Sequence, residues 1–420
     1  MKKNYDVAII GGGASGLAAA ITARRNAPEF SVAIFEKKEV TGKKLSATGN
    51  GRCNLSNIRC QLAESVMDFF NSVGISVRKD EEGRLYPYSE DAKDVTEILT
   101  ACARGEGAEI LLNSGISRME AEPEGGFLLF VGENVEPVHA AKVLIATGGK
   151  SYASMGTTGD GYVMARRLGH TVTKLVPGLT AVEVKADLSD IKGVRSKAVV
   201  TLYKDGEQIF TEKGEVQFRA DSISGICVMN MSRYIRVEAG ETMEDAMARY
   251  IVSVNLVPDF GTAEIIDMLK NRFLIKGLTV LEAMKTLVRE QLACRILAGA
   301  GIDGSASGTS AAFDDGKILA IVNGLRSLRL NVGGVKGWNE AQITLGGVSM
   351  DEINPVTMES KLVPGLFFSG EVTDFDGPCG GYNLHNAWVT GMLAGIGMTE
   401  NTSAAKDGMP ENVGRGGASV

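Results

Sequence analysis

Histidine and cysteine, two residue types that bind transition metals, are scarce and scattered in this sequence. Only three of its 420 residues are histidines, and His139, His170 and His385 lie far apart. The six cysteines include no CxxC pair. This spacing is typical neither of a zinc site nor of the disulfide framework of a small secreted domain. We therefore expect no metal centre.

Long apolar runs are also missing. The chain starts Met-Lys-Lys, but the apolar run 7–10 that follows is too short for a signal peptide. No stretch approaches the roughly 18 apolar residues of a membrane-spanning helix. Lys and Arg number 44 against 51 Asp and Glu, a formal charge of −7, which argues against a nucleic-acid partner without excluding a local basic patch. The sequence predicts a cytoplasmic protein acting on a small molecule, and leaves its oligomeric state open.

Glycine, by contrast, is abundant and clustered, with 52 residues. The first cluster, Gly11–Gly16, fits the pattern G-x-G-x-x-G. It lies between a predicted buried strand at 5–10 and a predicted helix at 14–27, with a further strand at 31–35 that ends just before Glu36. In such a βαβ unit the glycines let the backbone approach a pyrophosphate at the helix N-terminus, and the acid accepts hydrogen bonds from ribose hydroxyls. This unit predicts a dinucleotide site.

Three later segments indicate FAD rather than NAD. The loop 42–54 is rich in glycine, amide and hydroxyl groups, which a simple NAD dehydrogenase does not need at this position but a long ribityl chain does. Residues 146–149 close a strand, 370–374 end another, and 380–384 open the last helix. The N-terminus of that helix is suited to stabilising negative charge on a reduced flavin ring.

The residues expected to hold FAD come from all of these segments. From the first half they are Gly11, Gly13, Ala14, Ser15, Gly16, Glu36, Lys37, Lys43, Lys44, Ser46, Gly49, Asn50, Gly51, Arg52 and Asn54. From the rest of the chain they are Thr147, Gly148, Gly370, Glu371, Asp374, Gly381, Tyr382, Asn383 and Leu384.

The coarse pattern predicts an α/β protein whose Rossmann-like FAD-binding domain is interrupted. We expect the first part of that domain at 1–170 and its second part at 341–400, with a disordered tail at 401–420. An inserted substrate domain at 171–340 is predicted to be β-rich over 171–258 and helical over 259–320. A second G-x-G-x-x-G match, at 299–304, follows a helical pattern and is interpreted as a helix end rather than an NAD(P)H site.

Several long motifs resemble the YhiN/BaiN family of NAD(P)/FAD-dependent flavoproteins, related to aminoacetone oxidase. They are GKKLSATGNGRCN, GRLYPYSEDAKDV, ATGGKSY followed by TGDGY, GGVSMDEINPVTMESKLVPGLFFSGEVTDFDG and GGYN, and the similarity covers about residues 4–397. The resemblance implies a discontinuous FAD domain with a β-barrel-like insert and a small helical insert. Members are associated with reduction of a bile-acid dienone, oxidation of aminoacetone, and reduction of a uridine in ribosomal RNA.

The sequence departs from that pattern at 218–226. Many relatives resemble FTHxGLSGP there, whereas this chain reads FRADSISGI and lacks the Thr-His pair and the proline. Either the loop faces the flavin and alters substrate choice, or it is a structural loop that has drifted.

The catalytic candidates are Tyr382 as a substrate-side acid, Cys53 as a proton donor or redox partner, and His385 as a polar contact. Two of them have a structural alternative. Tyr382 packs near the flavin without taking part in catalysis, and Cys53 is a buried small residue. Arg195 and Arg219 of the insert are candidates to meet a substrate carboxylate, or are solvated surface residues.

We hypothesise hydride transfer between FAD and a small organic substrate, with the cofactor supplying the chemistry. The leading hypothesis is reduction of a C=C bond in a conjugated enone of the 3-dehydro bile-acid type, with NADH or NADPH as a transient electron donor. The alternatives are an aminoacetone or amine oxidase that produces H2O2, and a flavin-dependent dihydrouridine synthase acting on ribosomal RNA.

Overall fold

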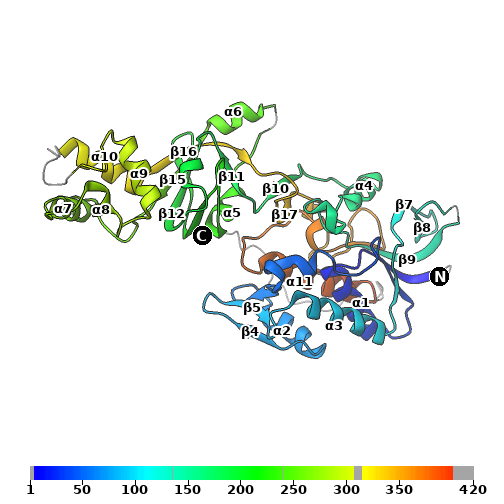
Figure 1. Cartoon of the computed structure of the whole chain (residues 1–420). Helices are drawn as coiled ribbons and strands as arrows, with labels where there is room; N and C mark the ends of the chain where they lie inside the picture. The colour runs from blue at the N-terminus through cyan, green and yellow to red at the C-terminus, as the bar shows by residue number, and fades with distance from the viewer. Residues whose placement is uncertain (1–3, 135, 239, 307–314, 401–420) are drawn as a thin grey trace, which may run out of the picture.

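The computed structural model describes residues 4–134, 136–238, 240–306 and 315–400. The tail predicted at 401–420 lies outside these residues. Figure 1 shows an elongated molecule of two bodies. The sheet body contains the first and last elements of the described chain, and the barrel body carries the helices α7 to α10 at its far end.

A seven-stranded sheet forms the centre of the sheet body, in the order β6-β2-β1-β9-β8-β7. The seventh strand, β18, pairs with residues 143–145 of β9, beyond the stretch 138–140 that pairs with β8. Its parallel strands are β1 (Asn4–Ile10), β2 (Val32–Phe35), β6 (Glu109–Leu111), β9 (Val138–Ile145) and β18 (Leu366–Phe368). The antiparallel pair is β7 (Ile116–Ala121) and β8 (Phe127–Val131). The βαβ unit is confirmed, with α1 at Ala14–Asn26 between β1 and β2.

The register brings four strand ends to one edge of the sheet. Ile10 of β1 pairs with both Phe35 of β2 and Ile145 of β9, and Phe368 of β18 pairs with Ile145. The glycine-rich segments that follow these strands therefore meet at the carboxyl edge, where parallel sheets bind nucleotides.

Helices cover the sheet and complete this body. The predicted helices near 62–73 and 90–105 are confirmed as α2 (Ala63–Ser72) and α3 (Ala92–Gly105). The others are α4 (Asp160–Arg167) and α11 (Tyr382–Gly397).

A small sheet joins β3 (Ser56–Asn57), β5 (Arg84–Pro87) and β4 (Val77–Lys79). Short 3₁₀ segments are η1 (Leu45–Gly51), which is kinked at residues 48–50, η2 (Ala153–Met155), η3 (Ser189–Ile191), η4 (Met350–Glu352) and η5 (Gly370–Val372).

Helices α1 and α11, far apart in sequence, pack almost backbone to backbone. A Cβ atom on Gly391 would lie 2.4 Å from the carbonyl oxygen of Ser15, and one on Gly395 would lie 2.7 Å from that of Ala19. Both contacts are closer than real side chains allow, so glycine is required at these two positions of α11.

Six antiparallel strands close a barrel in the other body. In spatial order they are β11 (Val182–Val184), β14 (Ser222–Ser224), β13 (Glu207–Phe218), β12 (Arg195–Lys204), β15 (Tyr250–Asn255) and β16 (Leu328–Val335). Helix α5 (Ile226–Ser232) follows β14, and α6 (Met243–Ala248) precedes β15. Closure by β16 was not predicted, because this strand comes only after the helical segment. The helices are thus an insertion within the barrel.

The helical segment contains α7 (Thr262–Phe273), α8 (Val280–Met284), α9 (Glu290–Gly299) and α10 (Asp315–Arg326). Helices α8 and α9 are separated by residues 285–289, and Arg289, with an extended backbone (ψ 145°), directly precedes α9. Helix α10 also runs past the predicted limit of 320. The interpretation of the second G-x-G-x-x-G match, at 299–304, as a helix end is confirmed. Helix α9 ends at Gly299, and Gly301 adopts a left-handed φ of 67°.

Two short strands join the bodies. β10 (Val176–Gly178) leads into the barrel and pairs antiparallel with β17 (Ile343–Leu345), which leads out of it. Figure 1 shows this pair lying between the two bodies. Among the described residues, no helix is both long and apolar enough to cross a membrane.

The α1–α11 contact predicts a steric penalty for Gly391→Ala. The added methyl group would force the helices apart, at a cost of about 1–3 kcal/mol typical of overpacking. Urea unfolding followed by circular dichroism measures this change. The matched control is Gly299→Ala at the end of α9, where a Cβ meets nothing within 4 Å. Equal stability of the two variants would contradict the predicted close contact.

Candidate functional site

The glycine loop after β1 leaves the N-terminus of α1 open to a ligand. Gly11 has a φ of 109°, and a Cβ there would lie 2.5 Å from the carbonyl oxygen of Ala146. A Cβ on Gly16 would lie 2.0 Å from the carbonyl oxygen of Gly11, so this residue lets helix pack on loop. Around Gly13 there is open space, and α1 has neither a side-chain cap nor an acid in its first turn. These features fit a phosphate group.

Glu36, at the end of β2, is held in a fixed orientation by backbone donors. The N–H of Gly12 donates to its Oε2 and the N–H of Lys38 to its Oε1, both at 2.8 Å. Each carboxylate oxygen keeps further lone pairs, so the group can still accept hydrogen bonds from ribose hydroxyls.

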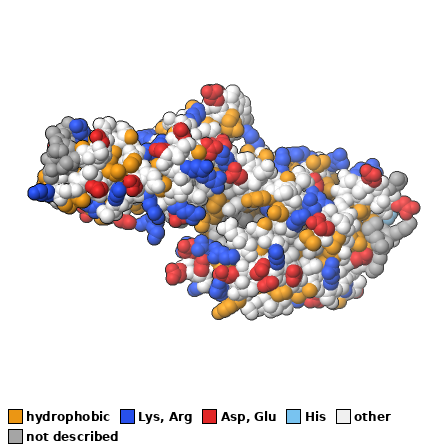
Figure 2. All heavy atoms as spheres, viewed as in Figure 1, with side chains coloured by type: hydrophobic (Ala, Val, Ile, Leu, Met, Phe, Trp, Pro, Cys, Tyr) orange, Lys and Arg blue, Asp and Glu red, His pale blue; other side chains and the backbone are white. Residues whose placement is uncertain are grey.

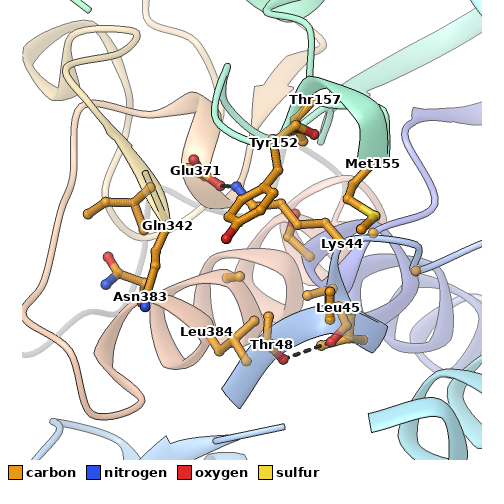
Figure 3. Close-up of a pocket in the computed structure, with 18 of the residues that line it drawn as sticks. Lys44, Leu45, Thr48, Tyr152, Met155, Thr157, Gln342, Glu371, Asn383 and Leu384 are labelled. Atoms are coloured by element: carbon orange, nitrogen blue, oxygen red, sulfur yellow. Dashed lines mark hydrogen bonds and ion pairs between the residues drawn. The ribbon is translucent and has the colours of Figure 1, made fainter. Parts of the chain in front are cut away.

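A polar network ties four segments together beside the cavity. Lys44 donates to Glu371 at 2.7 Å and to the hydroxyl of Ser151 at 2.8 Å. Glu371 also accepts from Ser151 at 3.1 Å and from the backbone N–H of Thr344 in β17 at 2.8 Å. Figure 3 shows the Lys44–Glu371 pair behind the ring of Tyr152. The carboxylate of Glu371 is therefore occupied by the protein's own donors.

The loop 42–54 is shaped by left-handed residues. Gly49, Asn50 and Cys53 have φ values of 59°, 55° and 58°. Around them the hydroxyl of Thr48 donates to the carbonyl of Leu45 at 2.7 Å, a contact drawn in Figure 3. The turn exposes backbone groups of the loop to the cavity, as expected for a segment that contacts a long cofactor.

The loop before α11 is fixed from within the sheet body. A Cβ on Gly381 would lie 2.4 Å from the carbonyl oxygen of Ser56, so the helix can begin there only with glycine. The side chain of Asn383 accepts from the N–H of Gly377 at 2.9 Å and donates to its carbonyl at 2.8 Å. Helix α11 has no acid in its first turn, so its positive end faces the cavity uncompensated.

All these segments line one cavity of about 510 Å³. Eighteen of the predicted cofactor residues line it: Gly11, Gly13, Ala14, Ser15, Glu36, Lys37, Lys43, Lys44, Gly49, Asn50, Arg52, Asn54, Thr147, Gly148, Glu371, Gly381, Asn383 and Leu384. The phosphate, ribose and helix-end groups together fit FAD.

Six predicted cofactor residues do not line the cavity. Gly16 and Gly370 permit close packing, the latter against Ser15, whose Oγ would lie 2.7 Å from an added Cβ. Ser46 bonds back to the carbonyl of Gly42 at 3.2 Å. The N–H of Asp374 donates to the carbonyl of Val348 at 2.9 Å. The remaining two are Gly51 and Tyr382.

None of the three catalytic candidates lines the cavity. Cys53 is fully buried, and this burial raises the pKa of its thiol to about 12. His385 is buried with both ring nitrogens engaged, Nδ1 by the hydroxyl of Ser56 at 2.8 Å and Nε2 by the carbonyl of Gln61 at 2.7 Å. Burial lowers its pKa, which favours the neutral ring. Tyr382 packs against Gly377 and Gly380. The position of Cys53 fits its structural alternative, a buried small residue.

The region where the two bodies meet supplies lining residues that are not among the predicted cofactor residues. They are mostly apolar: Ile226 and Met229 of α5, Leu179, Gln342 and Ile343 in or beside the joining strands, and Phe375, Pro378 and Cys379 of the loop before α11. Figure 2 shows hydrophobic side chains gathered where the two bodies meet. Tyr152 and Met155 complete the lining from the loop before α4, and Figure 3 shows the ring of Tyr152 pointing into the cavity. No periodicity marks these residues, since short apolar segments are equally typical of a core.

The arginine candidates of the insert do not line the cavity. Arg195 pairs with Glu215 at 3.0 Å and Arg219 with Glu340 at 2.7 Å, and all four side chains are exposed. The divergent segment 218–226 does reach the cavity, because it includes β14 and ends at Ile226. No three His, Cys, Asp or Glu side chains gather at a possible metal site within the described ranges.

Comparison with known proteins identifies the family to which this chain belongs. The model of the HI0933-like protein Rossmann domain matches residues 5–66 and 61–397. The chain belongs to this family. It is therefore an FAD-dependent oxidoreductase, as the cavity and the sequence motifs indicate.

Three curated relatives cover nearly the whole chain. The 3-dehydro-bile acid delta(4,6)-reductase of Clostridium scindens is 32% identical over 419 residues, which is 94% of this chain and 99% of the relative. The ribosomal RNA dihydrouridine synthase of Escherichia coli is 28% identical, over 92% and 96% of the two chains. That of Haemophilus influenzae is 27% identical, over 93% and 98%.

The fixed orientation of Glu36 predicts that Glu36→Gln weakens FAD binding. A hydrogen bond to a charged group contributes about 1.5–3 kcal/mol, so the dissociation constant should rise roughly 10- to 100-fold. Titration of the apoprotein with FAD, followed by flavin fluorescence, measures it. The control is Glu120→Gln, an exposed residue of β7 paired with Arg118. Unchanged affinity in Glu36→Gln would exclude a ribose contact.

The raised pKa of Cys53 predicts an inert thiol. At pH 8 the native protein should be alkylated by iodoacetamide at Cys294, which is exposed, and not at Cys53. Mass spectrometry of peptides reports both sites, and denatured protein serves as the positive control. Alkylation of Cys53 in native protein at the rate of Cys294 would show that it is accessible after all.

Proposed function

We propose that this flavoenzyme reduces the C=C bond of a conjugated enone in a steroid-like substrate of the bile-acid type, with NADH or NADPH as the electron donor. The observation that carries the proposal is the division of the cavity. Polar groups of the glycine-rich loops line one part of the cavity. Apolar residues line the part between the two bodies, and they come from α5 (Ile226 and Met229), from the joining segments (Leu179 and Ile343) and from the loop before α11 (Phe375 and Pro378). A flat hydrophobic substrate fits between such a wall and a flavin.

The name of the relative from C. scindens supports this substrate class. When bound, FAD supplies hydride transfer. The chain's own groups hold the reactants and set the electrostatics: Glu36 and the start of α1 bind the dinucleotide, and the positive end of α11 favours negative charge at the cavity. Ile226, Met229 and Phe375 offer apolar side chains to the cavity.

The dihydrouridine synthase relatives suggest a second candidate, an RNA substrate. Two features weigh against it. The formal charge is −7, and the barrel arginines Arg195 and Arg219 are already paired with acids. A phosphate backbone would have to displace those acids. Amine oxidation, the third candidate, has no lining residue that specifically favours it.

The proposal predicts two half-reactions in the purified yellow protein. Under anaerobic conditions NADH or NADPH, tested separately, should bleach the flavin absorbance, and a steroid 4-en-3-one should restore it with formation of the saturated ketone. Mass spectrometry of the product checks that two hydrogens have been added. Air and aminoacetone are the comparison substrates. Reoxidation by oxygen alone, or H2O2 release driven by the amine, would overturn the enone reductase proposal.

A further inference from the structure

Helix α5 packs on the barrel with one set of side chains and presents two other sets toward the sheet body. Cys227, Val228 and Met231 are fully buried and pack into the barrel core. Ile226 and Met229, three residues apart and therefore neighbours on the helix, line the cavity. Asn230 and Arg233, also three residues apart, reach across to the loop 376–380.

The barrel fixes the position of α5 tightly. Gly225 precedes the helix with a φ of 117°, and a Cβ there would lie 2.0 Å from the carbonyl oxygen of Glu215. A Cβ on Gly214 would lie 2.9 Å from the Cβ and the sulfur of Cys227. Because glycine is needed at both contacts, α5 lies directly on β13.

Two side chains of this helix hold the loop 376–380. The guanidinium of Arg233 donates from Nε to the carboxylate of Asp376 at 2.6 Å and from a terminal nitrogen to its carbonyl at 3.2 Å. The amide oxygen of Asn230 accepts from the N–H of Cys379 at 2.7 Å. The amide nitrogen of Asn230 donates to Glu212 of β13 at 2.9 Å and 3.0 Å, which fixes its orientation.

The held loop is itself part of the cavity wall. Pro378, Cys379 and Gly380 line the cavity, and Gly381 begins α11. Neither Asn230 nor Arg233 lines it. The contacts of α5 therefore connect the position of the barrel to the loop that enters the cofactor-facing end of α11.

The apolar residues on either side of this connection are accessible to solvent. Ile226 is 47% exposed and Phe375 is 45% exposed, although both line the cavity. Accessible apolar surface beside a cofactor site marks a place where a hydrophobic ligand binds.

We propose that α5 is the specificity element of the enzyme. Ile226 and Met229 form the wall against which an apolar substrate lies, and Asn230 and Arg233 are positioning residues that hold the opposite loop at the right distance. The substrate class rests on the proposed function, whereas the positioning of the loop does not.

Variants of the positioning residues test the second part without a substrate. In the holoenzyme, Arg233→Met and Asn230→Ala should release the loop, so iodide should quench flavin fluorescence more strongly and the visible flavin spectrum should shift. Arg233→Lys keeps the ion pair but loses the fork of two hydrogen bonds, so an intermediate effect is expected. The control is Arg195→Met, which breaks an exposed pair on the same barrel. FAD content and melting temperature verify that each variant is folded.

Variants of the wall test the first part. Ile226→Ser and Met229→Gln should raise KM for the steroid enone about tenfold, equivalent to about 1.4 kcal/mol. Ile209→Ser, another partly exposed isoleucine of the barrel, is the control. Arg233→Met should also raise KM, by changing the opposite wall.

The two proposals fail in different ways. If the wild type reduces no enone but Arg233→Met and Asn230→Ala alter flavin quenching and spectrum, the proposed substrate is wrong and the positioning role stands. If folded Arg233→Met and Asn230→Ala match Arg195→Met in quenching and spectrum, the positioning role is overturned. If the wild type reduces the enone and both wall variants keep its KM, α5 does not determine specificity.

Discussion

The near-contact of two helix backbones is the constraint on which the site depends. Helix α1 starts just after the first strand, and α11 is the last helix of the described chain, yet Gly391 and Gly395 bring α11 against the carbonyl groups of Ser15 and Ala19. Larger residues at these positions would separate the loop after β1 from the loops that precede α11. The cavity between them has its shape because no side chain intervenes.

The same edge of the sheet shows how one carboxylate joins several segments. Glu371, one of the predicted cofactor residues, lines the cavity and also accepts hydrogen bonds from Lys44, Ser151 and the N–H of Thr344. Because Thr344 belongs to β17, this network connects the cofactor loops to the strand that returns from the barrel. The polar half of the cavity and its attachment to the apolar half are thus held by one group of contacts.

Local signals in the sequence were sufficient for the sheet body and insufficient for the substrate side. The strand, glycine loop, helix and Glu36 follow from short-range rules of backbone conformation, and each lies where those rules place it. Strand β16 could not be assigned to the barrel, because its pairing with β11 and β15 depends on contacts across the intervening helices. Ile226, Met229 and Phe375 could not be recognised either, since an apolar residue has the same pattern on a cavity wall as in a core.

Residues such as Cys53 and His385 illustrate a different limit. Their positions beside glycine-rich motifs suggested chemistry, but hydrogen-bond partners and burial decide whether a polar side chain can meet a substrate. The nitrogens of His385 are used by Ser56 and Gln61, and that pairing joins segments more than 300 residues apart, as the separations of 329 and 324 show. Only the folded chain reveals it.

The antiparallel pair β10–β17 has a consequence for the order in which the protein assembles during synthesis. All strands of the barrel have been made once Val335 is complete, whereas β18 and α11 of the sheet body come later. Domains generally fold as units while the chain grows. The barrel is therefore able to close first, and its paired ends then present residues 178 and 343 side by side to the unfinished sheet. The insertion, of well over a hundred residues, thus leaves and re-enters the sheet body through two adjacent antiparallel strands, as a hairpin turn does.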